Sequence, residues 1–289
     1  MKTRIIVAAV GIPLLVLVVF LLPVWVFGGL LGVIAAIGAV EFVMATKTAT
    51  NIRMVVYCAA AAFAIPLAMS FTLPMAGTFI ALVLLLALAG EALLAYGTER
   101  AIPVGHITMA FFAGAVIPLL LGSLSTLRAI AEGMPMPFGE DGSFFDGRIY
   151  VLIPFVIAFA SDGGGYFVGN AFGKHKLIEK ISPKKTIEGS LGGFLATLVA
   201  VLIFCLVMIL AFDAEYNLAA VLIYSVVGSA VTQLGDLIFS FIKREYGKKD
   251  FGSLLPGHGG MLDRFDSLIV LAPFVAAMVL WFPIFWQGQ

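Results

Sequence analysis

The residues best suited to chemistry lie between positions 236 and 266, a stretch much more polar than the sequence around it. Asp236 opens this stretch, and Asp263 and Asp266 close it, three residues apart and therefore on one face of a helix. Carboxylate oxygens are hard ligands that suit Mg²⁺, which keeps waters and substrate phosphates as its other ligands. We expect Asp236 and Asp263 to bind Mg²⁺, with Asp266 as a third ligand or an orienting partner, and a second cation fits the same chemistry.

Basic residues and a serine accompany these carboxylates. Ser240, Lys243 and Arg244 lie four, seven and eight positions after Asp236, so on a helix they fall on or beside one stripe. The following connection adds further polar and small residues: Lys249, His258, Gly259, Gly260 and Arg264. Cations suit the oxygens of a polyphosphate, a serine can donate a hydrogen bond within the site, and glycine lets backbone approach a ligand closely. The pattern therefore predicts a site for a polyphosphate bound together with its metal.

Each of these features also has an ordinary explanation when it is taken alone. Asp263 could form a local ion pair with Arg264, His258 could be an ordinary loop histidine, and a basic loop is usually a solvated face. Their coincidence within one short stretch at a membrane edge favours a functional site over three unrelated features.

A second polar stretch, SDGGGYFVGNAFGKHKL at 161–177, closes another apolar run. Its Asp162 would lie in or near the membrane, where a carboxylate is costly unless it is paired or hydrated, so we expect it to contribute to substrate binding. The glycines after it allow a ligand to approach closely, but such glycines are more often packing surfaces between membrane helices.

A third polar stretch, KISPKKTIEGSLGG at 180–193, combines basic residues with signals for a helix start. Ser182 before Pro183 resembles such a start, and Ser190 is a candidate cap for the next apolar helix. The free N–H groups there would hold phosphate together with the neighbouring side chains of Lys184, Lys185 and Thr186. An anchor for anionic lipid headgroups explains the same residues equally well.

The elements that carry these stretches must be membrane helices. Hydrophobic residues make up 62% of the 289 positions and charged residues only 12%, whereas soluble domains are near half apolar and a quarter charged. A helix needs about 20 apolar residues to cross the bilayer. Nine such runs occur, at 5–22, 24–45, 53–71, 74–96, 104–124, 149–169, 190–212, 218–242 and 265–286. The sequence predicts an all-α polytopic integral membrane protein with about nine transmembrane helices.

The distribution of lysine and arginine predicts the orientation of these helices, because cytoplasmic loops carry the excess of both. With the N-terminus in the cytoplasm and the C-terminus outside, only Arg128 and Arg148 of the 17 basic residues lie outside. The Gly- and Pro-rich loop at 125–148 divides the chain into two predicted parts. Residues 1–125 form an N-terminal five-helix membrane scaffold, and residues 149–289 form a C-terminal four-helix catalytic membrane domain.

The polar residues between 240 and 266 resemble the signature of the phosphatidate cytidylyltransferases, also called CDP-diacylglycerol synthases. The resemblance rests on Ser240, Lys243, Arg244, Lys249, Asp250, Gly252, Leu255, Pro256, His258, Gly259, Gly260, Asp263, Arg264 and Asp266. It covers about residues 150–270 well and the first half only in hydropathy. Where members of this family commonly read SDTGAYFVGR, this chain reads SDGGGYFVGN, so Lys174 or Lys176 would have to replace the arginine.

This resemblance implies that CTP reacts with phosphatidic acid to give CDP-diacylglycerol and pyrophosphate, with Mg²⁺ as cofactor. Lys243, Arg244, Lys249 and His258 would hold the triphosphate and its leaving group, and the residues at 184–186 would receive phosphate from either substrate. The pocket would lie at the cytoplasmic edge of the plasma membrane, open to phosphatidic acid from the inner leaflet. The family also implies a homodimer, and no nucleic-acid partner is expected.

Two acids lie in the first half of the chain. Glu41 and Glu91 lie in or near predicted spans and are candidates for lining the substrate cavity, although Glu91 could equally be a surface acid. Two alternatives to the main interpretation also stay open. A nucleotidyltransferase for another lipid phosphate would share the metal site, and a polytopic transporter would string polar residues through the bilayer midplane.

Overall fold

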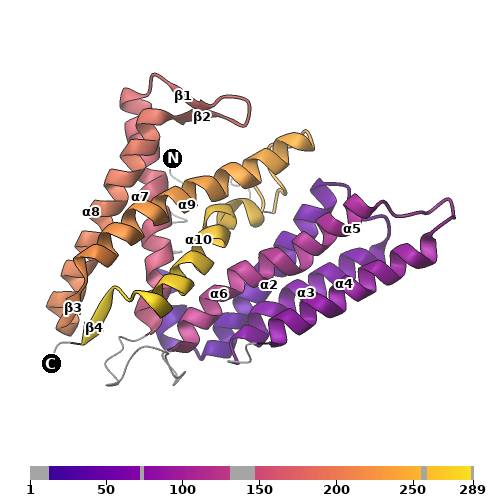
Figure 1. Ribbon diagram of the computed structural model, residues 1–289, viewed down its shortest axis with the longest axis horizontal. Coiled ribbons are helices and arrows are strands. Elements are labelled where there is room, and N and C mark those ends of the chain that lie inside the picture. The colour runs from indigo at the N-terminus through magenta and orange to yellow at the C-terminus, as the bar shows by residue number, and fades with distance from the viewer. Residues whose placement is uncertain (1–12, 72–74, 131–146, 255–258, 288–289) are drawn as a thin grey trace.

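The computed structural model describes residues 13–71, 75–130, 147–254 and 259–287, and it is built mainly from long helices (Figure 1). Within these ranges eight helical segments are long and apolar enough to cross a membrane. They are α2 (Val24–Ala45), α3 (Ile52–Met69), α4 (Ala76–Ala95), the continuous run of α5 (Val104–Phe111), η1 (Phe112–Val116) and α6 (Ile117–Ala129), then α7 (Gly147–Phe172), α8 (Ile187–Phe212), α9 (Leu218–Glu245) and α10 (Leu262–Trp281).

These eight segments correspond to eight of the nine predicted spans, and they confirm the predicted class of helical polytopic membrane protein. The remaining predicted span, at 5–22, lies partly outside the described residues. The total of nine, and the direction in which the helices cross, therefore stay predictions.

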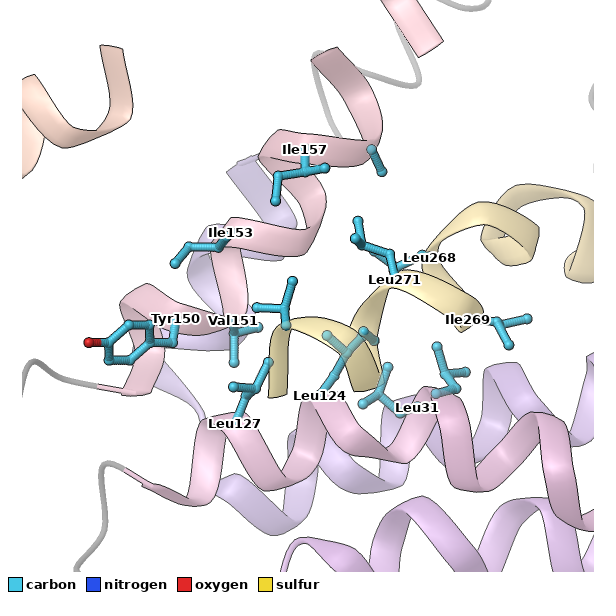
Figure 2. Close-up of a cluster of buried hydrophobic side chains, with 14 of the residues drawn as sticks. Leu31, Leu124, Leu127, Tyr150, Val151, Ile153, Ile157, Leu268, Ile269 and Leu271 are labelled. Atoms are coloured by element: carbon cyan, nitrogen blue, oxygen red, sulfur yellow. The ribbon is translucent and has the colours of Figure 1, made fainter. Parts of the chain in front are cut away.

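Helix α10 joins two groups of helices, α2 to α6 on one side and α7 to α9 on the other (Figure 1). Figure 2 shows how the groups meet: Leu31 of α2, Leu124 of α6, Val151 of α7 and Leu271 of α10 lie in one buried cluster. All four side chains are at most 3% exposed. The predicted parts at 1–125 and 149–289 thus share one core.

Glycines bring α7 and α8 into close backbone contact. A Cβ atom on Gly164 would lie 2.3 Å from Cβ of Ala196, and one on Gly192 would lie 2.4 Å from Cβ of Val168. Small residues at such contacts let membrane helices pack at short range. Packing therefore explains these glycines, and it holds the start of α8 next to the part of α7 that carries Asp162.

The connection between α7 and α8 is a β-hairpin. Strands β1 (Lys176–Ile178) and β2 (Ser182–Thr186) pair antiparallel, so the predicted helix start at Ser182 is wrong. Helix α8 begins at Ile187, and the hydroxyl of Thr186 accepts a hydrogen bond from the backbone N–H of Gly189 at 3.0 Å. Thr186 is the cap of this helix, in place of the predicted Ser190.

The end of α8 and the start of α9 adjoin a second two-stranded sheet. Strand β3 (Ala214–Tyr216) pairs antiparallel with β4 (Phe285–Gln287), which follows α10 near the end of the chain. The Tyr150 hydroxyl at the start of α7 donates a hydrogen bond to the carbonyl of Phe285 at 2.8 Å. This contact ties α7 to the segment after α10 at the end of the molecule away from the hairpin.

Candidate active site at one end of the helices

Four helix ends meet at the hairpin end of the molecule. Because consecutive helices run in opposite directions, the end of α7, the start of α8, the end of α9 and the start of α10 all lie there (Figure 1). The predicted site residues come from these four ends and from the hairpin. The fold thus brings together polar stretches that are far apart in the sequence.

A cavity of about 250 Å³ lies between α7, the hairpin, α8 and α9. Its lining consists mainly of polar and small residues: Ser161, Asp162, Gly165, Tyr166, Leu177, Lys184, Lys185, Thr186, Gly189, Ser190, Gln233 and Asp236. All four predicted residues from the second and third polar stretches, Asp162, Lys184, Lys185 and Thr186, are among them. The start of α8 also faces this space, and the positive end of its dipole favours an anion there.

Lys185 and Asp236 form the main ion pair of the cavity, with Nζ 2.5 Å from Oδ2. Asp236 also accepts a hydrogen bond from the Ser240 hydroxyl at 3.3 Å. Asp162 lines the same cavity, whereas Asp263 and Asp266 at the start of α10 are not among its lining residues.

Asp263 holds the connection between α9 and α10. Its Oδ1 accepts a hydrogen bond from Lys243 Nζ at 2.7 Å, and its Oδ2 accepts from the backbone N–H groups of Phe251 and Gly260 at 2.8 and 3.0 Å. Asp263 therefore pairs with Lys243 and not, as in the ordinary alternative, with its neighbour Arg264. Both oxygens of Asp263 are occupied by protein groups.

Lys243 bridges the two aspartates of α10. Its ammonium lies 2.7 Å from Asp263 and 3.6 Å from Asp266, and it sits 5.3 Å from the ring centroid of Phe251. The side chains of Lys243 and Asp263 are only 8% and 2% exposed. Within the described ranges no three carboxylate, imidazole or thiol groups are grouped closely enough to form a ready-made metal site.

The remaining predicted residues lie around this centre. Arg244 donates hydrogen bonds to the carbonyls of Ile181 and Lys248, so it fastens the end of α9 to the hairpin. Lys249 and Arg264 are exposed. Gly259 has a φ of +82°, a conformation that glycine adopts without strain. His258 lies outside the described residues.

Sequence reasoning missed a chain of polar groups that forms part of the cavity wall. The Ser161 and Ser229 hydroxyls are 2.9 Å apart, and Gln233 Nε2 donates to the Ser229 hydroxyl at 3.2 Å. The Ser190 hydroxyl donates to Gln233 Oε1, so this serine binds α9 instead of capping α8. A signal was available, because Ser229 and Gln233 continue the α9 stripe of Asp236 towards the N-terminus.

The two acids of the first half have different positions. Glu41 lies beside the start of α10, where it accepts hydrogen bonds from two backbone N–H groups. Glu91 lies apart from the cavity, with Arg53 Nε at 3.4 Å and the Tyr57 hydroxyl at 3.3 Å. Neither acid lines the cavity, so that expectation is wrong for both.

Comparisons with known proteins give one family. The model of the cytidylyltransferase family matches residues 2–282. A phosphatidate cytidylyltransferase of Bacillus subtilis is 45% identical over 152 residues, which are 52% of this chain and 55% of that protein. One of Haemophilus influenzae is 44% identical over 130 residues, 45% of each chain. One of Staphylococcus haemolyticus is 42% identical over 135 residues, 47% of this chain and 50% of that protein. The chain thus spans about half the length of the curated relatives it matches.

Proposed function

Because the chain belongs to the cytidylyltransferase family, we propose that it transfers CMP from CTP to phosphatidic acid, forming CDP-diacylglycerol and releasing pyrophosphate. The observation that carries this proposal is the cavity in which Lys185 and Asp236 meet at the capped start of α8. A helix start, a partly buried lysine and nearby carboxylates suit a phosphate that arrives with a metal ion. The membrane helices around this cavity suit a lipid as the second substrate.

In the proposed reaction, a phosphate oxygen of phosphatidic acid attacks the α-phosphorus of CTP. The bond from this phosphorus to the oxygen bridging to the β-phosphate breaks, and pyrophosphate leaves with the electron pair. The attacking oxygen is already anionic, so the protein needs no strong base and no covalent serine intermediate. Its task is to bring two polyanions together and to stabilise the charge that develops on the leaving group.

The chemistry of the side chains assigns these tasks. Lys185 and Lys184 on the hairpin would hold phosphate oxygens, assisted by the N–H groups at the start of α8. Lys243 of α9 would stabilise the leaving pyrophosphate, with Lys249 and Arg264 as further, exposed cations. Asp162 would orient the nucleotide from α7. Ser240 would hold the Asp236 carboxylate through its hydrogen bond.

The donor set fits Mg²⁺. Asp236 and Asp266 would supply hard oxygens, and Lys243 lies between Asp266 and Asp263. Mg²⁺ usually binds one or two carboxylates and takes waters and substrate phosphates as its other ligands, so three preassembled protein ligands are not required. When bound, the cation would neutralise charge on the transferring phosphoryl group. Lys185 and Lys243 form ion pairs with these carboxylates.

The hairpin end is proposed to face the cytoplasm, from which CTP would reach the cavity. The hairpin and the connection after α9 carry most of the basic residues of the second half, which supports this direction. Arg128 and Arg148 lie at the other ends of α6 and α7. Phosphatidic acid would then enter sideways from the inner leaflet.

Transfer of label tests this proposal. Purified protein in detergent is incubated with CTP labelled at the α-phosphate, Mg²⁺ and phosphatidic acid, and the lipid fraction is examined. Labelled lipid should form with phosphatidic acid, and chelation of divalent ions should abolish its formation. A parallel reaction contains a prenyl phosphate in place of phosphatidic acid. Labelled lipid in that reaction alone would assign another lipid substrate, and labelled lipid in neither reaction would refute the function.

A further inference from the structure

Glu41 of α2 supplies the cap for the start of α10. Its Oε1 accepts a hydrogen bond from the backbone N–H of Met261 at 3.0 Å, and its Oε2 accepts one from Leu262 at 2.9 Å. The first N–H groups of a helix have no partner within the helix. Met261, the residue just before α10, has no side-chain hydrogen bond to the helix. A carboxylate from a distant part of the chain therefore takes the place of a local cap.

The connection before α10 is shaped to admit this carboxylate. A Cβ atom on Gly252 would lie 2.2 Å from Glu41 Oε1, and one on Gly260 would lie 2.5 Å from Glu41 Oε2. Any side chain at either position would collide with the carboxylate. These two glycines are thus explained by the close approach of Glu41, in addition to any contact with substrate.

Other residues of α2 also contact the start of α10 and the connection before it. Gly38, one turn before Glu41, leaves room for Leu262, whose Cδ1 would lie 3.3 Å from a Cβ at that position. The ring of Phe42 stacks on the ring of Phe251 with centroids 5.3 Å apart. The same connection is held from the other side by Asp263, which accepts from the N–H of Phe251. Two carboxylates, Glu41 from the first half of the chain and Asp263 from the second, therefore hold this connection by hydrogen bonds to its backbone.

We propose that Glu41 is a positioning residue for the reaction, because it fixes the start of α10 and hence the positions of Asp263 and Asp266. Leu262, whose N–H it binds, directly precedes Asp263, and Asp266 lies one turn further along the same helix. Glu41 acts through these aspartates and does not line the cavity itself. The inference rests on the proposed function, and it gives the N-terminal helices a role in catalysis.

The variant Glu41→Gln tests this role with little change in side-chain volume. An amide keeps one acceptor oxygen but turns an NH₂ group towards a backbone N–H, so one cap bond is lost. Partners that orient metal ligands typically contribute 10- to 100-fold to metal affinity or activity, so we expect a rise of roughly that size in the Mg²⁺ concentration needed for half-maximal turnover. A loss of folded protein alone would lower the rate and leave this midpoint unchanged, and that result would overturn the proposal.

Glu91→Gln is the matched control, because it alters another buried acid of the first half that has polar partners of its own. It should leave the Mg²⁺ midpoint at the wild-type value. An equal shift in both variants would mean that any buried acid in these helices produces the effect, which would also overturn the proposal.

A double variant tests the contact itself. Gly252→Ala alone should raise the Mg²⁺ midpoint, because the new methyl group displaces the Glu41 carboxylate. In Glu41→Ala the three atoms that it would meet are gone, so adding Gly252→Ala should change the midpoint little further. Additive effects of the two substitutions would show that Gly252 and Glu41 act independently, against the proposal.

Amide hydrogen exchange provides a readout that does not depend on turnover. Peptides covering Gly260 to Asp266 should exchange faster in Glu41→Gln than in the wild type, whereas Glu91→Gln should match the wild type. If the wild-type protein transfers no CMP, the proposed function fails, while faster exchange would still show that Glu41 holds the start of α10. Unchanged exchange in Glu41→Gln would refute the positioning role whatever the activity.

Discussion

Replacing Lys243 with methionine should destabilise the protein strongly. Methionine retains the apolar contact with the Phe251 ring but removes the charge that faces Asp263 and Asp266. Those carboxylates would then be left without their buried counter-charge, at positions where the Lys243 and Asp263 side chains are 8% and 2% exposed. Removing one partner of a buried ion pair typically costs about 3–5 kcal/mol.

The assay is thermal unfolding of the purified protein in one detergent at one pH. A loss of 1 kcal/mol lowers the Tm of a chain of this size class by roughly 2–4 °C, so the fall should be on the order of 10 °C. Lys248→Met, an exposed lysine of the same connection, is the matched control and should leave Tm nearly unchanged. The comparison separates loss of the buried charge from loss of a lysine in general.

A second substitution tests the reason for the loss. In Lys243→Met with Asp263→Asn, the amide oxygen can still accept from the N–H groups of Phe251 and Gly260, but the uncompensated charge is gone. The double variant should recover part of the lost Tm. A single variant as stable as the wild type, or a double variant less stable than the single one, would refute this electrostatic explanation.

Two further substitutions test the elements that frame the cavity. Thr186→Ala removes the cap of α8 and should cost about 1 kcal/mol, measured as a lower Tm. Thr186→Ser keeps a hydroxyl and should retain most of the wild-type stability. Equal Tm values for the wild type and both variants would contradict the capping role. Gly192→Ala forces a methyl group to within 2.4 Å of Val168 and should cost roughly 1–3 kcal/mol, whereas Gly163→Ala, with open space around it, should be tolerated. Equal tolerance of both alanines would contradict the close packing of α7 on α8.

The helices and the α9 stripe could be predicted because both depend on local sequence. Apolar runs of about 20 residues are dictated by the bilayer, and the spacing of Asp236 and Ser240 places them together on any helix. The same regularity would have added Gln233, one turn earlier on that stripe. Whatever helical geometry alone determines can therefore be predicted from the spacing of residues along the chain.

Contacts between distant segments could not be predicted in the same way. The cap of α10 comes from Glu41, more than 200 residues earlier, and nothing in the spacing around Met261 points to it. The hairpin at 176–186 resembles a helix start in its sequence because Ser182 and Pro183 suit both, and pairing with β1 decides between them. Thr186 caps α8 instead of Ser190 because the hydroxyl of Ser190 is used by Gln233 of the neighbouring helix.

The central claim, that carboxylates from α9 and α10 and lysines of the hairpin act at one catalytic site, is tested most directly by the rate of CMP transfer in Asp236→Asn. Asp213→Asn is the control, because Asp213 ends α8 at the opposite end of the molecule with a φ of +49°, which asparagine also tolerates. Loss of one preorganised electrostatic group typically costs about 10²- to 10³-fold, so the rate of folded Asp236→Asn should fall by that factor while Asp213→Asn stays at the wild-type rate. Wild-type turnover and Mg²⁺ dependence in folded Asp236→Asn would contradict the claim.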